Sequence, residues 1–437
     1  MYEINITADE LIASLLRISE TECVCLLDSC DVGHLGSHLL IAGIDPVETA
    51  EISNNDPAET LVKIDEYIAS ELACIFSISY DFGQKLLALK ARKKEFRGVA
   101  EPDLFIASFE VLLIHDYDTG KTFLTGNDQK FGVISARLSA NVENTVFDTE
   151  TPAVDVTSNF TRSSYIASIE TIKEHIRSGD TYQTNLTQQL TAPAPNDLSP
   201  QQIFWRLRRD HPAPFGAFLK RNDSTVVSAS PERFFKIDSD RTISTSPIKG
   251  TRPRGATADE DNALRHELLT SKKDLAENTM IVDLLRNDLG RLCEYGSVVV
   301  EKLCELEEHP TFFHLVSTIN GKLRDNIKMS EILRAVFPCG SITGAPKIST
   351  MRIIDEIETA PRGLSMGAIG YSIQNSKFEI PNCTDLSVAI RTAVIRDQIA
   401  SFNVGGGIVI DSDPESEYDE TLTKAKALLA AIGGKLS

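Results

Sequence analysis

One lysine lies in a short segment whose sequence limits where its amine can point. The run Ser246-Pro247-Ile248-Lys249-Gly250-Thr251 places Lys249 between a proline and a glycine, and such a segment is stiff on one side and can turn sharply on the other. A free lysine is protonated at neutral pH and attacks a substrate only when it is desolvated or lies beside another cation. The segment therefore predicts either a positioned nucleophile or an ordinary surface lysine in a Pro/Gly loop.

Two groups of carboxylates are placed so that they could share a cation. Asp274 and Glu277 lie one turn apart on an otherwise apolar face of a predicted helix, where an unpaired carboxylate is costly. A second helix start, Asp413-Pro414, is followed by Glu417 and Glu420, which face one way. Acidic helix starts also offset the helix macrodipole, which is the simpler explanation. Four carboxyls on two helices nevertheless suit Mg²⁺, whereas no His and Cys spacing suggests a transition metal.

The elements that must position these residues indicate an α+β fold. Short strands joined by turns rather than by crossover helices favour a mainly antiparallel β-sandwich with helices packed outside. In the first part of the chain the predicted strands span 23–27, 39–42, 75–79 and 105–115, and a helix spans 58–71. In the second part the predicted strands span 182–190, 215–219, 225–228, 234–237, 367–373, 387–395 and 399–404, and an amphipathic helix spans 163–179.

A polar, threonine-rich segment from 141 to 159 predicts a linker between an N-terminal region, 1–140, and a second domain, 160–434, that carries most of the candidate residues. Gly405-Gly406-Gly407 follows a predicted strand but lacks the spacing of a dinucleotide fingerprint. It predicts either a bend or a backbone that a ligand can approach closely.

The bulk composition limits the partners and the compartment. The net charge of −19 over 437 residues argues against nucleic acid or an anionic membrane as a partner, because both require basic patches. Eight cysteines without C-x-x-C spacing predict reduced thiols. Because no apolar run could span a membrane and the N-terminus lacks a signal peptide, we expect a cytoplasmic protein.

These residues stand within an ordered series of motifs that resembles the chorismate-utilising enzyme family. The matching runs are 179–188, 230–234, 247–251, 277–288, 314–317, 340–347, 389–392 and 405–420. The resemblance is weaker in the first region, where it rests on 26–29 and 79–83. It implies the chorismate-binding fold, similar to that of anthranilate synthase component I, with chorismate as the substrate and Mg²⁺ as the cofactor.

Two positions separate the branches of this family. Members that make isochorismate or salicylate carry a lysine, which activates water, where this chain has Gln183. Members that make anthranilate share the glutamine but have alanine where this chain has Lys249. The combination present here resembles the aminodeoxychorismate synthase branch, whose component I converts chorismate and ammonia to 4-amino-4-deoxychorismate for 4-aminobenzoate and folate. An anthranilate synthase component I and a non-catalytic chorismate-binding subunit are the alternatives.

The resemblance also implies a role for each candidate residue. Lys249 would attack C2 of chorismate to form a covalent adduct, while Glu232 would act as the general acid for the C4 hydroxyl. The expected metal ligands are Glu277 and Glu420, with Glu417 and Asp274 near or acting through waters. The expected substrate contacts are Gln183, Thr251, His314, Thr343, Ser365, Arg391, Gly405, Gly406, Gly407 and Lys424. Arg391 would hold the enolpyruvyl carboxylate, because its fork matches a carboxylate better than lysine does.

The chain departs from the family at two places. Ser365 stands where the family usually has tyrosine, so the hydroxyl is kept but its reach is shorter. Asp28 and Ser29 match a possible regulatory pocket for tryptophan, but residues 30–38 depart from the family pattern.

Two partners follow from what the sequence lacks. It shows no glutaminase-like cysteine motif, so we expect ammonia from a glutamine amidotransferase subunit or from free ammonium. The chain ends at Ser437, too early for a fused lyase, so we expect a separate aminodeoxychorismate lyase to act downstream.

Overall fold

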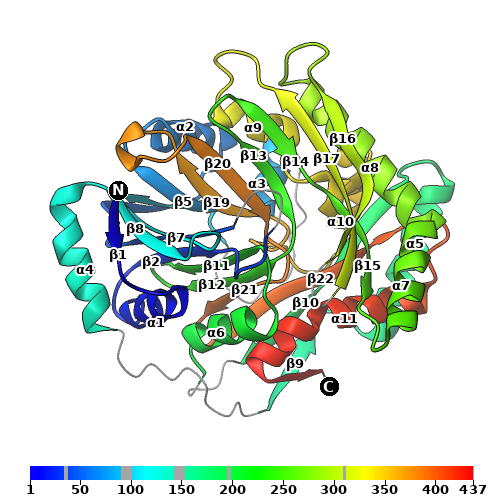
Figure 1. Cartoon of the computed structure of the whole chain (residues 1–437). Coiled ribbons are helices and arrows are strands. Elements are labelled where there is room, and N and C mark those ends of the chain that lie inside the picture. Colours follow the sequence, from blue (N-terminus) through cyan, green and yellow to red (C-terminus); the bar gives the residue numbers. More distant parts are fainter. Residues whose placement is uncertain (34–37, 90–100, 142–152, 194–197, 309–311, 437) are drawn as a thin grey trace.

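Two large sheets form the centre of the molecule, and helices lie around them (Figure 1). The structure is a computed structural model that describes residues 1–33, 38–89, 101–141, 153–193, 198–308 and 312–436. In these residues the first sheet, here called sheet I, has 13 strands and the second, sheet II, has 10. All paired strands are antiparallel except β9 (Val154–Ser158) and β23 (Gly434–Leu436), which are parallel.

Sheet I runs, in spatial order, β1 (Tyr2–Ile4), β8 (Lys121–Gly126), β7 (Val111–Asp116), β3 (Leu39–Ile44), β2 (Val24–Asp28), β11 (Phe215–Lys220), β12 (Thr225–Ser230), β21 (Thr392–Arg396), β22 (Ile399–Ile408), β10 (Gln183–Pro193), β9 and β23, with β18 (Gly344–Ala345) paired to β10. Sheet II runs β15 (Ile248–Pro253), β17 (Phe312–Lys322), β14 (Thr242–Thr245), β13 (Arg233–Ile237), β20 (Cys383–Val388), β19 (Ala368–Ile373), β5 (Ala73–Ile78), β6 (Leu104–Phe109) and β4 (Glu48–Ile52), with β16 (Val299–Glu308) paired to β17.

Many of the described helices begin at a capping side chain. The α-helices are α1 (Ala8–Ile18), α2 (Pro57–Ile68), α3 (Tyr80–Leu86), α4 (Phe131–Ala140), α5 (Arg162–Arg177), α6 (Pro200–Asp210), α7 (Ala258–Thr270), α8 (Lys272–Gly290), α9 (Met329–Val336), α10 (Lys347–Ile357) and α11 (Pro414–Ile432), and the 3₁₀ helices are η1 (Asp128–Lys130), η2 (Gly340–Ile342) and η3 (Ser376–Phe378). Asp413 caps α11, whose C-terminal end is closed by the left-handed Gly433, and Ser271 caps α8. None of the described helices is both long enough and apolar enough to cross a membrane.

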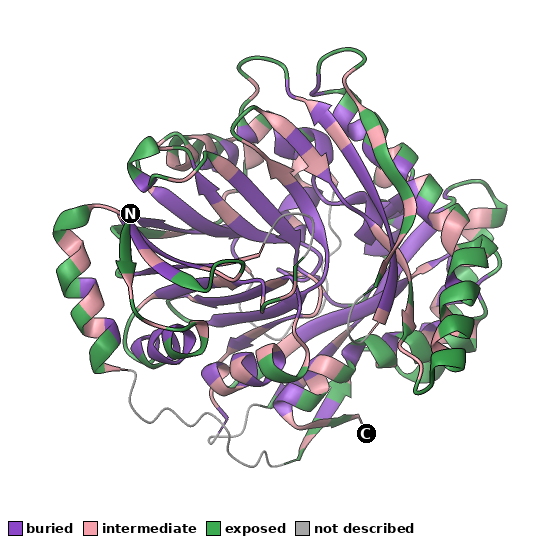
Figure 2. Cartoon of the chain, viewed as in Figure 1, coloured by how far each residue is buried: buried purple, intermediate pink, exposed green. Residues whose placement is uncertain are grey.

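Apolar clusters show which elements pack together. One cluster combines α1, α6 and α11 with strands of sheet I, and a second combines α2, α8 and α9 with strands of sheet II. A third draws Ile41 and Leu219 from sheet I and Ile75, Phe105 and Ile369 from sheet II. Figure 2 shows the strands mostly buried and the exposed surface on the outer helices. The predicted mixture of helices and large antiparallel sheets is confirmed, whereas the sandwich stays a prediction.

The bounds of the strands differ from the sequence expectations in three places. The run predicted as one strand over 105–115 is the hairpin β6–β7, and the run over 387–395 is divided between β20 and β21. The break before β21 contains Arg391, whose φ of 49° lies in the left-handed region and interrupts an extended strand. Part of the predicted linker forms β9, while 142–152 lies outside the described residues. Both sheets take strands from both sides of this linker.

Candidate functional site

The glycine triplet lies in a regular strand that carries the floor of the site. Gly405, Gly406 and Gly407 belong to β22, where they pair with residues of β10, so the alternative of a bend is wrong. A Cβ atom on Gly407 would lie 2.1 Å from Nε2 of Gln183 and 3.6 Å from Nζ of Lys249. The absent side chain therefore allows these two groups to approach the strand.

The neighbouring glycine faces a different set of groups. A Cβ atom on Gly406 would lie 3.3 Å from Oε2 of Glu417, 3.8 Å from Nζ of Lys424 and 3.9 Å from Oε1 of Glu420. Successive residues of a strand point to opposite faces. Gly407 of β22 therefore faces the predicted nucleophile Lys249, whereas the adjacent Gly406 faces the carboxylates of α11.

Lys249 lies in β15, where the strand departs from regular pairing. The register with β17 shifts between Lys249 and Thr251, and the intervening Gly250 has φ of 78°. A Cβ atom on Gly250 would lie 2.8 Å from Leu268 and 3.0 Å from Asp274, so both the backbone and the space require glycine. The Lys249 amine donates to the backbone carbonyl of Ser341 at 3.3 Å. This irregular turn of the strand fixes the direction of the amine.

Glu232 is a buried acid beside that amine. It is 5% exposed, and its Oε1 has no hydrogen-bond partner among the described residues. Burial raises the pKa of Glu232, and the Ser341 hydroxyl, the Lys249 charge and the Ile248 backbone offset the rise only in part. The carboxyl is therefore biased toward its protonated form, as a general acid requires.

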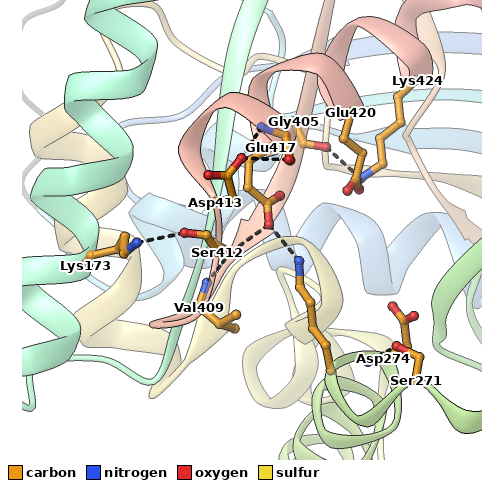
Figure 3. A network of polar contacts seen from close by, with 12 residues as sticks. Lys173, Ser271, Asp274, Gly405, Val409, Ser412, Asp413, Glu417, Glu420 and Lys424 are labelled. Carbon is orange, nitrogen blue, oxygen red and sulfur yellow. Dashed lines mark hydrogen bonds and ion pairs between the residues drawn. The ribbon is translucent and has the colours of Figure 1, made fainter.

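Glu417, Glu420 and Lys424 of α11 lie near one another (Figure 3), and Lys273 of α8 pairs with Glu417. Glu417 accepts from the Ser412 hydroxyl and from Lys273, each at 2.7 Å. Glu420 pairs with Lys424 at 2.8 Å, and Lys424 also donates to the Gly405 carbonyl at 3.0 Å. Burial raises the pKa of Glu420, but Lys424, Lys273 and Lys249 outweigh burial and hold it below its usual value.

Glu277 differs from these two glutamates because it lacks a direct partner. Its Oε1 is buried without a hydrogen bond among the described residues. Burial raises its pKa, the charges of Lys249 and Lys273 lower it, and the nearby carboxylates of Glu417 and Asp274 raise it further. A buried carboxylate oxygen without a hydrogen bond, near the carboxylates of Glu417 and Asp274, is chemically suited to a hard cation.

The predicted metal site stays a prediction. No group of three or more His, Cys, Asp or Glu side chains in the described residues is already assembled for a metal ion. Asp274 is the residue that departs most, because its carboxylate accepts from Arg252 at 3.2 Å. Lys273, which was not a candidate from the sequence, lies among the glutamates instead. Its place beside Asp274 on the first turn of α8 was the available signal.

Arg391 has no carboxylate partner among the described residues, although desolvation lowers the pKa of its guanidinium. Its left-handed backbone lies between β20 and β21. The residue is only partly exposed. An unpaired and desolvated guanidinium is costly unless an anion binds to it, so this position fits an anionic ligand.

The remaining predicted contacts are placed differently from one another. Thr251 is exposed and pairs across the ladder with His314, which is buried and stacks on Phe312. The hydroxyl of Thr343 donates to the Cys339 carbonyl at 3.0 Å. The Ser365 hydroxyl accepts from the backbone N–H of Asn403 at 3.2 Å. Thr343 and Ser365 therefore hold backbone around the site.

A buried ion pair supports these elements and was missed from the sequence. Glu358 and Arg362 are joined at 2.8 Å, and both are almost fully buried. Arg362 donates to the Asn185 carbonyl at 2.6 Å and to the Ile342 carbonyl at 2.9 Å, and Glu358 accepts from the Thr187 N–H at 2.8 Å. The pair ties β10 to η2. The i, i+4 spacing of opposite charges was the signal, although such spacing is common on exposed helices.

The possible regulatory residues Asp28 and Ser29 lie in a separate place. They line a small cavity of about 50 Å³ between sheets I and II, together with Phe215, Gly216 and Tyr371. Asp28 accepts from Tyr117 at 2.6 Å and from Arg208 at 2.8 Å. Its carboxylate is thus already neutralised within the protein, and the tryptophan pocket stays a prediction.

Comparisons with known proteins show which family the chain resembles in sequence and in fold. A model of the chorismate binding enzymes matches residues 22–430. Aminodeoxychorismate synthase of Streptomyces griseus is 46% identical over 271 residues, which is 62% of this chain but only 36% of that protein. Aminodeoxychorismate synthase component 1 of Escherichia coli (strain K12) is 38% identical over 356 residues, covering 81% of this chain and 75% of that protein.

A solved structure gives the same result for the fold. The crystal structure of anthranilate synthase component I from Streptococcus pneumoniae TIGR4 superposes with a TM-score of 0.77 at 27% identity, covering 91% of this chain and 93% of that one. The chain matches little more than a third of the length of the S. griseus relative. The similarity therefore concerns that matched part and not the whole of that protein.

Proposed function

This chain belongs to the family of chorismate binding enzymes, and we propose that it acts as component I of an aminodeoxychorismate synthase. In this role it converts chorismate and ammonia to 4-amino-4-deoxychorismate and water. The observation that carries the proposal is the pair formed by Lys249 and Gln183, which both approach Gly407. Gln183 cannot accept a proton from water at neutral pH, whereas an unprotonated lysine amine is a nucleophile.

The first step forms a covalent adduct on Lys249. Its nitrogen bonds to C2 of chorismate, the ring electrons shift, and the bond between C4 and the hydroxyl oxygen breaks. Glu232 supplies the proton, so the hydroxyl leaves as water, and the new amine loses a proton to solvent. Burial of Glu232 raises its pKa, which keeps that proton available near neutral pH.

The second step replaces the lysine by ammonia. The ammonia nitrogen bonds to C4, the ring electrons return, and the C2–nitrogen bond to Lys249 breaks. The lysine amine departs with a proton taken from the incoming ammonia. The amino group then stands where the hydroxyl was, and the enolpyruvyl ether is unchanged. Without an amine at position 249, ammonia can attack C2 directly, which leads toward anthranilate.

Two groups account for binding of the dianionic substrate. Arg391 has no carboxylate partner of its own among the described residues and would hold the enolpyruvyl carboxylate through paired hydrogen bonds. Mg²⁺, when bound by Glu277 and Glu420 with help from Glu417, would supply positive charge to the ring carboxylate. Asp274 would act only through a water molecule, because Arg252 already occupies its carboxylate.

The proposed reaction requires a source of ammonia and a consumer of the product. A glutamine amidotransferase subunit would supply ammonia, and free ammonium would replace it in a test tube. An aminodeoxychorismate lyase would then release 4-aminobenzoate for folate biosynthesis.

One experiment separates this proposal from the alternatives. The purified chain is incubated with chorismate, Mg²⁺ and ammonium, with and without added aminodeoxychorismate lyase. We expect 4-aminobenzoate only when the lyase is present. Anthranilate fluorescence without the lyase would support an anthranilate synthase, and no turnover would support a non-catalytic subunit.

The same assay applied to Lys249→Ala tests the mechanism. We expect the 4-amino product to fall by at least about a hundredfold, because nucleophilic catalysis is lost, and the remaining product to shift toward 2-amination. An unchanged rate of 4-amino product formation would overturn the role of Lys249.

A further inference from the structure

The carboxylates of α8 and α11 are already balanced by cations that belong to the chain. Lys273 binds Glu417 at 2.7 Å, and Lys424 binds Glu420 at 2.8 Å, while Glu277 keeps one buried oxygen without a partner among the described residues. The charges of Glu417, Glu277 and Glu420 all act on the Lys273 ammonium. Lys273 thus contacts Glu417 directly, and Glu417 and Glu420 lie close to each other beside Gly406.

The position of Lys273 on its helix is unusual for a lysine. It lies in the first turn of α8, directly after the Ser271 cap and Lys272. A cation in the first turn opposes the helix macrodipole, so helix stability does not explain it. Its ion pair with Glu417 reaches across to α11 and gives a reason for the position.

The two partners differ in their freedom to move. The Glu417 side chain is 4% exposed and is also held by the Ser412 hydroxyl at 2.7 Å, whereas the Lys273 side chain is 44% exposed. The lysine can leave toward solvent by rotating its flexible stem, while the carboxylate stays in place. Displacement of the ammonium would free a carboxylate oxygen without rearranging either helix.

We propose that Lys273 is an internal counter-ion that occupies the divalent-cation site and competes with the metal for Glu417. The lysine offsets the mutual repulsion of three carboxylates when no metal is bound. The metal must displace it, so the lysine weakens metal affinity while protecting the metal-free fold. This inference rests on the proposed function only in assigning these carboxylates to a metal.

The test uses Mn²⁺ as the probe and the purified full chain without chorismate. Lys273→Met should bind Mn²⁺ about tenfold more tightly than the wild type, as measured by isothermal titration calorimetry, because removing one of two competing ligands removes an unfavourable coupling. The same variant should melt at a lower temperature without metal and show a larger rise in melting temperature when Mn²⁺ is added.

Two further variants serve as matched controls. Lys272→Met removes the same charge from the same helix turn, but Lys272 is exposed and makes no ion pair in the described structure, so its Mn²⁺ affinity should stay close to that of the wild type. Lys273→Arg keeps the cation and should restore weak binding. Should Lys273→Met not fold, Lys273→Gln makes the same comparison.

The outcomes separate this inference from the proposed reaction. Equal Mn²⁺ affinity in Lys273→Met and Lys272→Met, or no Mn²⁺ binding by the wild type, would overturn the competition. A tighter Mn²⁺ site in a chain that makes no 4-amino product would leave the competition standing and reject the proposed function instead.

Discussion

Buried charges that the fold leaves without a partner distinguish this site at the scale of single residues. Glu232 and Glu277 each keep a buried carboxylate oxygen without a hydrogen bond in the described structure, and Arg391 has no carboxylate partner there. Each of these groups lowers the stability of the empty protein. A ligand that satisfies them recovers that free energy as binding or catalysis.

The first prediction concerns Glu232. Its folded-state pKa lies above the ordinary glutamate value, so the folded protein binds more protons than the unfolded chain between those two values, and stability falls as pH rises through that window. Glu232→Gln removes the ionisable group. We expect a loss of turnover of about 10²- to 10⁴-fold, together with a gain in melting temperature that is larger at pH 8 than at pH 4.

Thermal melts of wild type and variant at both pH values check this expectation. A melting-temperature difference that does not depend on pH would show that ionisation of Glu232 does not lower the stability of the folded protein.

The second prediction concerns Arg391. We expect Arg391→Met to raise the KM for chorismate about 10- to 100-fold, because charge-assisted hydrogen bonds contribute about 1.5–3 kcal/mol, and to leave the urea midpoint unchanged or higher. Steady-state kinetics and urea unfolding measure the two effects. A lower midpoint with an unchanged KM would assign Arg391 a structural role.

The candidate residues were named from the sequence through the family resemblance, and their roles stay predictions. The contacts that those residues make within the protein were harder to predict. The sequence does not show that Asp274 is occupied by Arg252 or that Glu417 is held by Lys273, because both contacts depend on the relative placement of β15, α8 and α11. Lys273 therefore escaped notice.

At the scale of elements, an irregular strand is what aims the nucleophile. β15 shifts register at Gly250, whose left-handed backbone packs against α7 and α8. In a regular strand, successive side chains point to opposite faces of the sheet, so the position in the strand alone decides the direction of each side chain. The bulge allows Lys249 to point toward the β22 floor while the strand stays paired to β17.

The third prediction uses two glycines with almost the same backbone. Gly250 and Gly296 have φ of 78° and 79°, but a Cβ atom meets atoms within 3.0 Å only at Gly250, and nothing within 4 Å at Gly296. Gly296→Ala should cost about 1–2 kcal/mol of unfolding free energy from backbone strain alone and leave turnover unchanged. Gly250→Ala should cost more and lower turnover.

Chemical denaturation and product assays compare the two variants. Equal losses of stability with full activity in both would mean that the packing of Gly250 does not position Lys249.

Elements with strong local signals matched the sequence expectations closely. The start of α11 at Pro414 agrees with the helix start predicted at Asp413-Pro414. The division of 387–395 into β20 and β21 could not be read from composition, because the break depends on the left-handed Arg391, and arginine has no preference for that conformation.

At the scale of the whole molecule, the two sequence regions are woven into shared sheets. β11 pairs with β2 across residues 216–219, and β19 pairs with β5 across residues 368–372. Each of these central strands would become an unpaired edge without the N-terminal region. Pairings of such long sequence separation carry no local signal, so the linker between 141 and 159 suggested a separation that the strand order does not follow.

The fourth prediction follows from this interleaving. A fragment of residues 160–437 should fail to fold alone, whereas the full chain should unfold in urea as one cooperative transition. Near-ultraviolet circular dichroism of the fragment and two-probe denaturation of the full chain test both statements. A soluble fragment with native-like near-ultraviolet signal would show that the second region is an independent domain.

The way Lys249 is held has a consequence for how such enzymes diversify. Within the described structure its amine makes a single hydrogen bond, to the Ser341 backbone carbonyl, and no neighbouring side chain relies on it for an ion pair. Exchange of this residue therefore breaks no ion pair and one hydrogen bond to backbone, although it also removes a charge that acts on Glu232, Glu277 and Glu420. After a gene duplication, one copy can therefore acquire a different residue at position 249, and with it a different amination product, while the encoded protein still folds.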